Sequence, residues 1–478
     1  MPARYNRINE FFLGKWYPVL TFLLVVLGYV TGLEVYTLLI NTVLMAFAIV
    51  RTLSIKPMLF YMLTFMYQFS AQHLPMRPFY SDHYYSGHRP FVIVASGVII
   101  VVAVLIYFVR SKVLRFVTWR KIPLLLPLIL FCGAMLVNGL FVKGNDIMDF
   151  VWGCGQVLVY LVIYLLCYLG LRNENRRELF DYFRHLVTLM SWVIVLECAW
   201  FIVSGDRSFG QVVSERSLAL GVGNCNIVGA HAAMLIPANL YGLMKGKRPY
   251  LSLLTGFAVY AVAMVSTSRN AMLFGTVYFI CAFIFCAFFG SKKKQMGRLI
   301  VSATVFLVVF AIIFRAEVVS VIKLYLDRGM GNNGRYPLWE RAWQLFLESP
   351  IFGKGFFTLD LTTPNSFDKL SFELVPDFAH NTVFELLGAT GIVGFVTYSI
   401  YRISTLVIAF RKPNAERIAL VISALYIVFA SLLDNFVFQI FSPVFYTVTM
   451  VIAVFLYEDD MRREVGKKSV AKSVGIYK

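Results

Sequence analysis

Acidic residues are scarce in this chain. The 478 residues include 26 Asp and Glu against 44 Lys and Arg, and charged residues of either sign make up only 15%. Soluble domains typically carry about 25% charged residues. The hydrophobic fraction is instead 59% and the mean hydropathy is +0.72. These values exclude an ordinary soluble domain and predict a chain that consists mostly of transmembrane helix.

Cysteine is also sparse, and no two cysteines form a CxxC pair. The seven cysteines mostly lie inside apolar runs, which indicates neither a disulfide framework nor a thiolate metal site. The predicted outer loops contain no DxD, HExxH, GxSxG or P-loop motif, although a metal-assisted or serine-nucleophile mechanism would need one. We therefore expect any reaction to proceed without a metal ion or a cofactor.

Long apolar runs dominate what is present. About 14 runs, or between about 12 and 14 if the weakest are discounted, reach the roughly 16 to 25 residues that cross a bilayer core. No repeat of about 20 to 50 residues is evident, so we predict one all-α polytopic membrane domain over residues 1–478. The runs start near Tyr17, Leu33, Pro57, Pro90, Ile122, Ile147, His185, Asn226, Leu251, Asn270, Leu299, Asn381, Ile418 and Gln439.

Basic residues alternate between dense and sparse loops, and the positive-inside rule assigns the dense loops to the cytoplasm. Both termini, including a basic tail at 460–478, are then cytoplasmic. The net charge of +18 is spread over short loops, so we expect it to face anionic membrane lipids and not nucleic acid. The dense clusters are Arg4/Arg7/Lys15, Arg51/Lys56, Arg110 to Lys121, Arg172 to Arg184, Lys245 to Arg248, Lys292 to Arg298, Arg402 to Arg417 and Arg462 to Lys478.

One predicted extracytoplasmic loop is long: it covers residues 315–379, inserted between two apolar helices. A loop of this size in a compact protein is usually functional. Within it we predict an amphipathic helix over 335–348, because Leu338, Ala342 and Leu345 recur at helical spacing after a proline suited to the first turn. The apolar face of this helix is expected to lie on the bilayer interface or on the transmembrane bundle.

Three residues at the predicted outer boundary can carry chemistry. Arg269 lies between two apolar spans, where a guanidinium needs an anion or backbone carbonyls; a snorkelling arginine is the alternative. Arg335 starts the loop helix and can bind a polyphosphate in bidentate fashion. His380 opens a transmembrane helix and can act as a general base, with a hydrogen-bonded helix-cap histidine as the alternative.

Three acids, Glu197, Glu385 and Asp434, fall inside predicted spans and need arginines or protons as partners. They leave a transport function open, although no two similar halves are evident and the candidate cations gather at the outer boundary. A receptor-like protein would leave the arginines and the histidine unexplained. Arg341 follows Arg335 by about one and a half helical turns and better fits a solvated or headgroup-contacting residue.

Taken in order, these segments resemble the superfamily of bacterial O-antigen ligases and O-antigen and capsular polysaccharide polymerases. Thr267-Ser-Arg269-Asn resembles the family's Ser-Arg element at a helix end. Gly334-Arg335-Tyr-Pro-Leu-Trp339, followed by Gly353 and Gly355, resembles its large periplasmic loop. Phe378-Ala-His380-Asn381 resembles its histidine element.

A further element lies upstream. Arg216, followed by glycines and Asn226, is similar to the family's arginine, glycine and asparagine stretch before a membrane helix, but Cys225 stands where the family often has proline. The motif-bearing half runs from about Arg216 to Asn435. The first 200 or so residues are recognisable only as membrane helices.

The resemblance implies a GT-C-like glycosyltransferase of the bacterial cytoplasmic membrane. It would transfer a glycan from undecaprenyl diphosphate to an acceptor sugar hydroxyl on the outer face, without a metal and with inversion. Arg269 and Arg335 would bind the diphosphate, and His380 would activate the hydroxyl. Substrate binding would involve Arg216, Asn226, Asn381, Arg341 and Glu385.

Polymerase is the interpretation we favour, on the basis of the extra helices. A ligase that transfers the glycan to lipid A core, a protein O-oligosaccharyltransferase, and a lipid-linked oligosaccharide flippase or other transporter are the alternatives. The expected partners are the undecaprenyl-diphosphate-linked oligosaccharide, an acceptor glycan and membrane lipids, together with a flippase and a chain-length regulator of the export pathway.

Overall fold

The computed structural model describes residues 3–69, 89–140, 142, 147–205, 207–245, 248–289, 293–313, 315–316, 319, 322–323, 335–357, 379–411, 413–438 and 441–475. Regular structure in these ranges is helical, apart from one isolated bridge between Leu220 and Gly223. The all-α prediction is thus confirmed over the described residues. The glycine-rich segment 328–334 and the polar part of the long loop, 358–378, lie outside them.

The chain divides into two compact units. The first comprises Met1–Phe116 and Tyr182–Gly331. Its helices are α1 (Ala3–Leu13), α2 (Trp16–Thr31), α3 (Glu34–Thr52), α4 (Met58–Phe69), α5 (Arg89–Ser111), η1 (Val113–Phe116), α9 (Arg176–Ser204) from Tyr182 onward, α10 (Phe209–Glu215), α11 (Cys225–Lys245), α12 (Pro249–Val265), α13 (Arg269–Phe289) and α14 (Lys293–Ile313).

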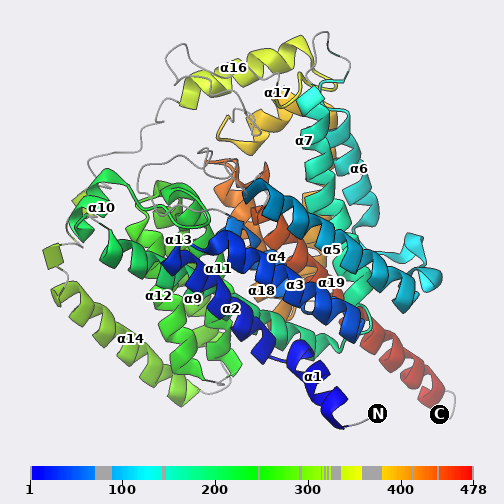
Figure 1. Ribbon diagram of the computed structural model, residues 1–478, viewed down its shortest axis with the longest axis horizontal. Helices are drawn as coiled ribbons and strands as arrows, with labels where there is room; N and C mark the ends of the chain where they lie inside the picture. The colour runs from blue at the N-terminus through cyan, green and yellow to red at the C-terminus, as the bar shows by residue number, and fades with distance from the viewer. Residues whose placement is uncertain are drawn as a thin grey trace. The chain divides into compact units, whose positions relative to one another are not determined.

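The second unit comprises Val117–Asp181 and Asn332–Lys478. Its helices are η2 (Trp119–Lys121), α6 (Leu125–Leu136), α7 (Ile147–Val157), the π-helical turn η3 (Leu158–Val162), α8 (Ile163–Leu171), α16 (Arg335–Glu348), α17 (Thr382–Phe410), α18 (Ala415–Ala430), η4 (Phe436–Phe438) and α19 (Phe441–Gly475). The predicted amphipathic helix over 335–348 is confirmed as α16, which runs crosswise to α6 and α7 (Figure 1).

A helix stands at each of the predicted apolar runs. Among the described residues, 7 helices are long and apolar enough to cross a membrane, or up to 8 if the bent pair of α1 and α2 counts as one span. A multi-pass membrane protein is therefore supported, whereas the count of about 14 crossings remains a prediction. The 7 helices are Glu34–Thr52, Phe91–Ser111, Ile147–Leu171, Arg176–Ser204, Cys225–Met244, Arg269–Cys286 and Thr382–Phe410.

Helix α11 forms the centre of the first unit. It packs against α12 and α13, and its apolar window is 94% buried, against 22% for the window of α5. The exposed side of α5 consists of aliphatic side chains such as Val98, Leu105 and Val109. Exposed aliphatic surface on a long apolar helix is what contact with lipid tails produces.

Helix α17 is broken at Gly391, whose backbone has φ 63° and ψ −161°. A break leaves backbone groups without intrahelical partners, and these groups must be satisfied locally at membrane depth. The segment that follows α16 supplies the partners. The N–H groups of Lys354 and Gly355 donate to the carbonyls of Gly388 and Ala389 at 2.8 and 2.9 Å.

Hydrogen bonds in the opposite direction satisfy the backbone N–H groups that follow the break. The N–H of Ile392 donates to the carbonyl of Pro350 at 2.8 Å, and that of Val393 donates to Ile351 at 3.2 Å. Asp149 of α7 accepts the N–H of Phe357 at 2.6 Å. Helix α16 is thus held to the body of the second unit by the residues that follow it, 350–357, which close the gap in α17.

Candidate functional site

The turn that carries His380 lies immediately before α17. His380 has a left-handed backbone, with φ 52°, which is uncommon for a residue other than glycine and typical of positions held by their surroundings. Asn381 caps the helix, because its Oδ1 accepts the N–H groups of Val383 and Phe384 at 2.9 and 3.4 Å. Its Nδ2 donates to the carbonyl of Leu432 at 3.0 Å, so Asn381 also joins this turn to the end of α18.

His380 pairs with Asp434 in the segment after α18. The imidazole Nδ1 lies 2.9 Å from Oδ1 of Asp434, and the side chains are 42% and 10% exposed, respectively. An ionised carboxylate can only accept, so the Nδ1 of a neutral His380 carries the proton and donates it to Asp434. Nε2 then keeps its lone pair and is the nitrogen able to take a proton from a substrate.

Glu385 lies one helical turn after the start of α17 and is fully buried. Its carboxylate binds the segment that carries His380. Its Oε2 accepts the N–H of Ala379 at 2.6 Å and the side-chain amide of Asn435 at 2.8 Å. Asn435 in turn donates its N–H to Oδ1 of Asp434 at 2.9 Å. The structure therefore places Glu385, expected to bind substrate, behind the histidine, where it links the turns that carry His380 and Asp434.

Helix α16 brings an arginine and a tryptophan to the same cluster. Nη1 of Arg335 donates to the carbonyl of Leu433, the residue before Asp434. Nε1 of Trp339 donates to the carbonyl of Ala379 at 2.9 Å, and its ring stacks on Phe384 at 5.5 Å between centroids. The two backbone groups of Ala379 are thus held from opposite directions, by Trp339 and by Glu385.

Arg341 lies on the exposed side of α16. Near the end of the same helix, the ammonium group of Lys354 is 2.9 Å from the carboxylate of Glu348. That hydrogen bond and charge hold the pKa of Glu348 below its usual value. The outward side of α16 is therefore polar along part of its length, while Ala342 and Leu345 are buried beneath it.

In the first unit, the structure brings Arg216 and Asn226 together. Arg216 ends α10 with φ 56°, and its Nη2 donates to Oδ1 of Asn226 at 2.8 Å. A buried glutamate again supports the loop, because Oε2 of Glu197 accepts the N–H of Gly221 at 3.2 Å. A side chain on Gly221 would meet the carbonyl of Tyr67, so this loop lies directly on the helices beneath it.

Arg269 is the first residue of α13 and is half-buried. The preceding Ser266, Thr267 and Ser268 are buried, and Thr267 has a left-handed backbone with φ 52°. A guanidinium at the start of a helix lies among backbone N–H groups that also favour an anion. The local structure around Arg269 therefore suits a negatively charged ligand.

Sequence reasoning missed the roles of Trp339 and Asn435. From the sequence, Trp339 is recognisable only as part of the apolar face of the predicted helix. No sequence signal identifies Ala379, 40 residues later, as the acceptor of its indole N–H. Asp434 is recognisable from the sequence as an acid that needs a partner. The only sequence signal for Asn435 is its position next to this acid, at the end of an apolar run.

The cluster in the second unit thus combines a histidine paired with a carboxylate and a nearby guanidinium, Arg335, beside a helix N-terminus. Among the described residues, no group of three His, Cys, Asp or Glu side chains could hold a metal ion. No curated protein matches the chain. Residues 251–399 match the family model described as O-antigen ligase, a range that includes Arg269, Arg335, Arg341, His380, Asn381 and Glu385. The resemblance predicted from the sequence is therefore confirmed: over these residues the chain is similar to the O-antigen ligase domain of the O-antigen ligase and polymerase superfamily.

Proposed function

We propose that this protein is a polysaccharide polymerase. It transfers an O-antigen or capsule repeat unit from undecaprenyl diphosphate to a sugar hydroxyl of an acceptor glycan, at the outer face of the bacterial cytoplasmic membrane. The observation that carries the proposal is the His380–Asp434 pair at 2.9 Å, with Arg335 bonded to the residue before Asp434. The family match over 251–399 supports the same class of reaction.

The reaction replaces one bond to the sugar C1 carbon by another. The acceptor oxygen forms a bond to C1 while the bond from C1 to the diphosphate oxygen breaks, and undecaprenyl diphosphate leaves with the electron pair. Opposite-face attack inverts the anomeric centre in one displacement, so no covalent sugar–enzyme intermediate forms. Negative charge grows on the leaving diphosphate throughout this step.

The arginines supply the electrostatic part of the mechanism. Arg335, Arg269 and Arg216 bind the diphosphate and stabilise the charge that develops on it, which is the contribution a metal ion makes in other phosphate chemistry. Such preorganised donors contribute more than water does because they need not reorient during the reaction. Asn226 orients Arg216 in this scheme through their 2.8 Å hydrogen bond.

His380 supplies the base. Its Nε2 takes the proton of the acceptor hydroxyl as the new bond forms, and Asp434 stabilises the imidazolium that results. Asn381 and Glu385 hold the turn in place from the two sides described above. Arg341, on the exposed side of α16, is the candidate to contact outlying phosphate or sugar groups of the substrate.

Contacts between predicted cytoplasmic loops support the membrane orientation. Nε2 of His185 lies 3.2 Å from the carbonyl of Lys15, and the ammonium of Lys56 lies 4.5 Å from the ring centre of Tyr182. All four residues lie within or directly next to the basic clusters that the positive-inside rule assigns to one side. We therefore propose that both termini are cytoplasmic and that the His380 turn faces outward.

The decisive experiment uses purified protein in liposomes with a lipid-diphosphate oligosaccharide as the only substrate. A ladder of longer glycans with released lipid diphosphate supports a polymerase. The family model is described as O-antigen ligase, so the alternative is transfer to lipid A core. Products that appear only when lipid A core is added would establish the ligase and reject the polymerase.

A second arm of the same experiment tests the base. His380→Ala should lower the rate by about 100- to 10,000-fold, the range that positioned acid–base groups contribute. His185→Ala is the matched control, because His185 lies on the predicted cytoplasmic side and should leave the rate unchanged. Wild-type elongation by His380→Ala would remove the base from the proposal.

A further inference from the structure

A buried glutamate supports the loop that carries Arg216 in the first unit. Glu197 lies about two turns before the end of α9 and is fully buried. Its Oε2 accepts the N–H of Gly221 at 3.2 Å, and its Oε1 has no hydrogen-bond partner among the described residues. A carboxyl group inside an apolar helix is costly to bury, and such residues mark functional positions. The hydrogen bond to Gly221 therefore points to the role of Glu197.

Gly221 fits closely between Glu197 and α4. A Cβ atom on Gly221 would lie 2.6 Å from the carbonyl oxygen of Tyr67 in α4 and 3.3 Å from Oε2 of Glu197. The first of these distances is too short for a carbon and an oxygen that are not bonded to each other. Only glycine therefore lets the loop contact both α4 and α9, and these two contacts fix its position.

Short hydrogen-bonded turns connect that glycine to the start of α11. Leu220 and Gly223 exchange backbone hydrogen bonds at 2.9 and 3.0 Å. Asn224 then caps α11, because its Oδ1 accepts the N–H groups of Asn226 and Ile227 at 3.0 and 3.3 Å. Asn226 is thus held in place relative to the contact between the loop and α9.

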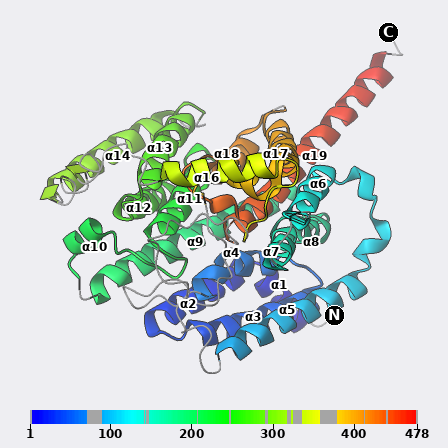
Figure 2. The same ribbon diagram turned by 90° about the horizontal axis from the view of Figure 1, so that it is seen from above.

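Arg216, which precedes these turns in the chain, is bonded to Asn226. Its Nη2 donates to Oδ1 of Asn226 at 2.8 Å, which joins the end of α10 to the start of α11. Figures 1 and 2 show α10 at the edge of the first unit and α11 in its interior. Nε of Arg216 is buried and, in the part of the chain that the structure describes, has no hydrogen-bond partner. The guanidinium is therefore oriented through one N–H while another is left for an anionic ligand.

We propose that Glu197 is a positioning residue, which holds the Arg216 guanidinium in the orientation that a diphosphate ligand requires. Glu197 acts through Gly221 and Asn226, and its role rests on the proposed function, which assigns Arg216 to the leaving diphosphate. It does not touch the substrate, because it is fully buried. Without the carboxyl group the turn at Gly221 loses its contact with α9, and Arg216 meets the diphosphate in a less favourable orientation. Misplacement by about 1 Å can slow a reaction about 100-fold.

Steady-state kinetics of the full chain in liposomes test the proposal, with a lipid-diphosphate oligosaccharide as the donor. Glu197→Ala should lower kcat/KM by about 5- to 100-fold and raise KM for the donor, as expected for one lost hydrogen bond that positions a group. Glu197→Gln keeps an oxygen that can accept the N–H of Gly221 and should restore most of the loss. Gly221→Ala, which forces the loop away from Tyr67, should resemble Glu197→Ala. Wild-type kinetics of Glu197→Ala, or an equal loss in Glu197→Gln, would overturn the proposal.

A double-mutant cycle separates positioning from support of the fold. Glu197→Ala in an Arg216→Gln background should change kcat/KM by less than about twofold, because the residue acts only through Arg216. Losses that multiply would overturn the proposal. Thr42→Val is the matched structural control, since it removes a buried hydrogen bond to Tyr61 at 2.8 Å in the same unit. It should lower the melting temperature and leave KM for the donor unchanged. Should Glu197→Ala fail to fold, Gly221→Ala takes its place in the cycle.

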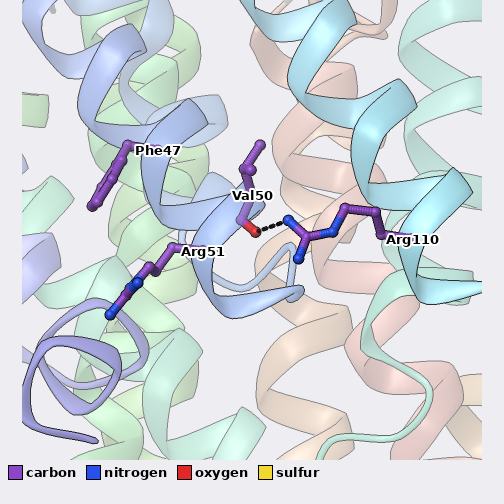
Figure 3. A pocket seen from close by; sticks show the side chains of 4 residues that line it. All are labelled: Phe47, Val50, Arg51 and Arg110. Carbon is purple, nitrogen blue, oxygen red and sulfur yellow. Dashed lines mark hydrogen bonds between the residues drawn. The ribbon is translucent and has the colours of Figure 1, made fainter. Parts of the chain in front are cut away.

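Binding of undecaprenyl diphosphate alone distinguishes failure of this proposal from failure of the proposed function. Native mass spectrometry should show about tenfold weaker binding in Glu197→Ala and in Arg216→Gln than in the wild type. Arg110→Gln is the charge-matched control, because Nη1 of Arg110 donates to the carbonyl of Val50 at 3.2 Å at the predicted cytoplasmic end of α5 (Figure 3). This variant should bind like the wild type. Weakened binding without any glycan transfer would reject the proposed function and keep the positioning role. Transfer with binding and rates that Glu197→Ala leaves unchanged would do the reverse.

Discussion

At the scale of single residues, the His380 turn shows how the fold holds a side chain in an unfavourable backbone conformation. A non-glycine residue with positive φ costs roughly 1 to 3 kcal/mol. Hydrogen bonds to Ala379 on one side and Asn381 on the other maintain this conformation. The imidazole is thereby held with Nδ1 on Asp434, and the proposed mechanism assigns Nε2 to the acceptor hydroxyl.

Asp434→Asn tests that arrangement. The amide can present its N–H₂ to Nδ1 and so favour the wrong tautomer, which should lower turnover by about 100- to 10,000-fold with little change in KM. Steady-state kinetics with the lipid-linked oligosaccharide provide the measurement. Asp460→Asn, far from this turn in α19, is the control, and an Asp434→Asn enzyme with normal turnover would show that Asp434 does not orient the base.

Trp339 provides a second test at this scale. Trp339→Phe keeps an aromatic ring on Phe384 but removes the N–H that Ala379 accepts at 2.9 Å. A lost hydrogen bond that leaves a carbonyl unpaired costs about 1 to 3 kcal/mol, so turnover should fall by about 5- to 100-fold if this energy holds the turn. Trp343→Phe on the exposed side of α16 should have no such effect. Identical rates for both variants would contradict the role of Trp339.

At the scale of elements, α17 depends on its break at Gly391. The break frees backbone groups that residues 350–355 then satisfy, and this exchange connects α16 to the transmembrane helices. The combination of φ 63° and ψ −161° at Gly391 is essentially restricted to glycine. A continuous helix would leave the segment after α16 without these partners.

Gly391→Ala should therefore destabilise the protein. A Cβ there would meet the carbonyl of Ile351, and the backbone conformation disfavours any side chain, so we expect a loss of about 2 kcal/mol or more. Thermal unfolding in detergent, followed by circular dichroism, provides the measurement. At Gly155 in α7 an added Cβ would meet nothing within 4 Å, and Gly155→Ala should melt like the wild type or slightly higher. A Gly391→Ala protein with unchanged stability would contradict this account of the break.

A buried arginine of α17 joins this helix to two further elements of the second unit. The guanidinium carbon of Arg402 in α17 lies 4.2 to 5.7 Å from the ring centres of Tyr160, Tyr398, Tyr401 and Tyr446. Cation–π contacts of desolvated groups contribute about 2 kcal/mol each, enough to offset much of the cost of removing the charge from water. The inner half of α17 is thus held to η3 and α19 by aromatic faces around one cation.

At the scale of the whole molecule, the proposed reaction assigns Arg269, Arg335 and His380, which lie far apart in the sequence, to one transition state. Groups that act on one transition state lose their effects non-additively when they are removed together. The rates of single and double variants therefore test whether these residues act on the same transition state.

Arg269→Gln and Arg335→Gln should each lower turnover by about 100- to 1,000-fold, as single oxyanion-stabilising groups do. When Arg269→Gln is combined with His380→Ala, turnover should fall little further than in the single variants. Both residues act on one transition state in the proposed reaction, so their effects are not additive. Single-turnover rates of the two single variants and the double variant provide the measurement. Losses that multiply would show that Arg269 acts elsewhere, and Arg315→Gln, in the same predicted outer region, is the charge-matched control.

Local composition determines much of this protein. Apolar runs of membrane length predict helices that are present at each expected position, and the spacing of apolar residues after a proline suited to the first turn predicts the helix over 335–348. These features depend on residues near one another in the chain and on their transfer from water to lipid, which is why sequence suffices. The motifs around Arg269, Arg335 and His380 likewise indicate the family from short segments.

Contacts between distant segments were decided only by the tertiary structure. Asp434 meets His380 across 54 residues, Trp339 meets Ala379 across 40, and the segment after α16 fills the break in α17. Hydrogen bonds such as these depend on where helices end in space, which hydropathy and charge do not specify. The sequence by itself thus determined which segments are apolar helices and which residues the proposed reaction would use, and the fold decided which partners those side chains meet.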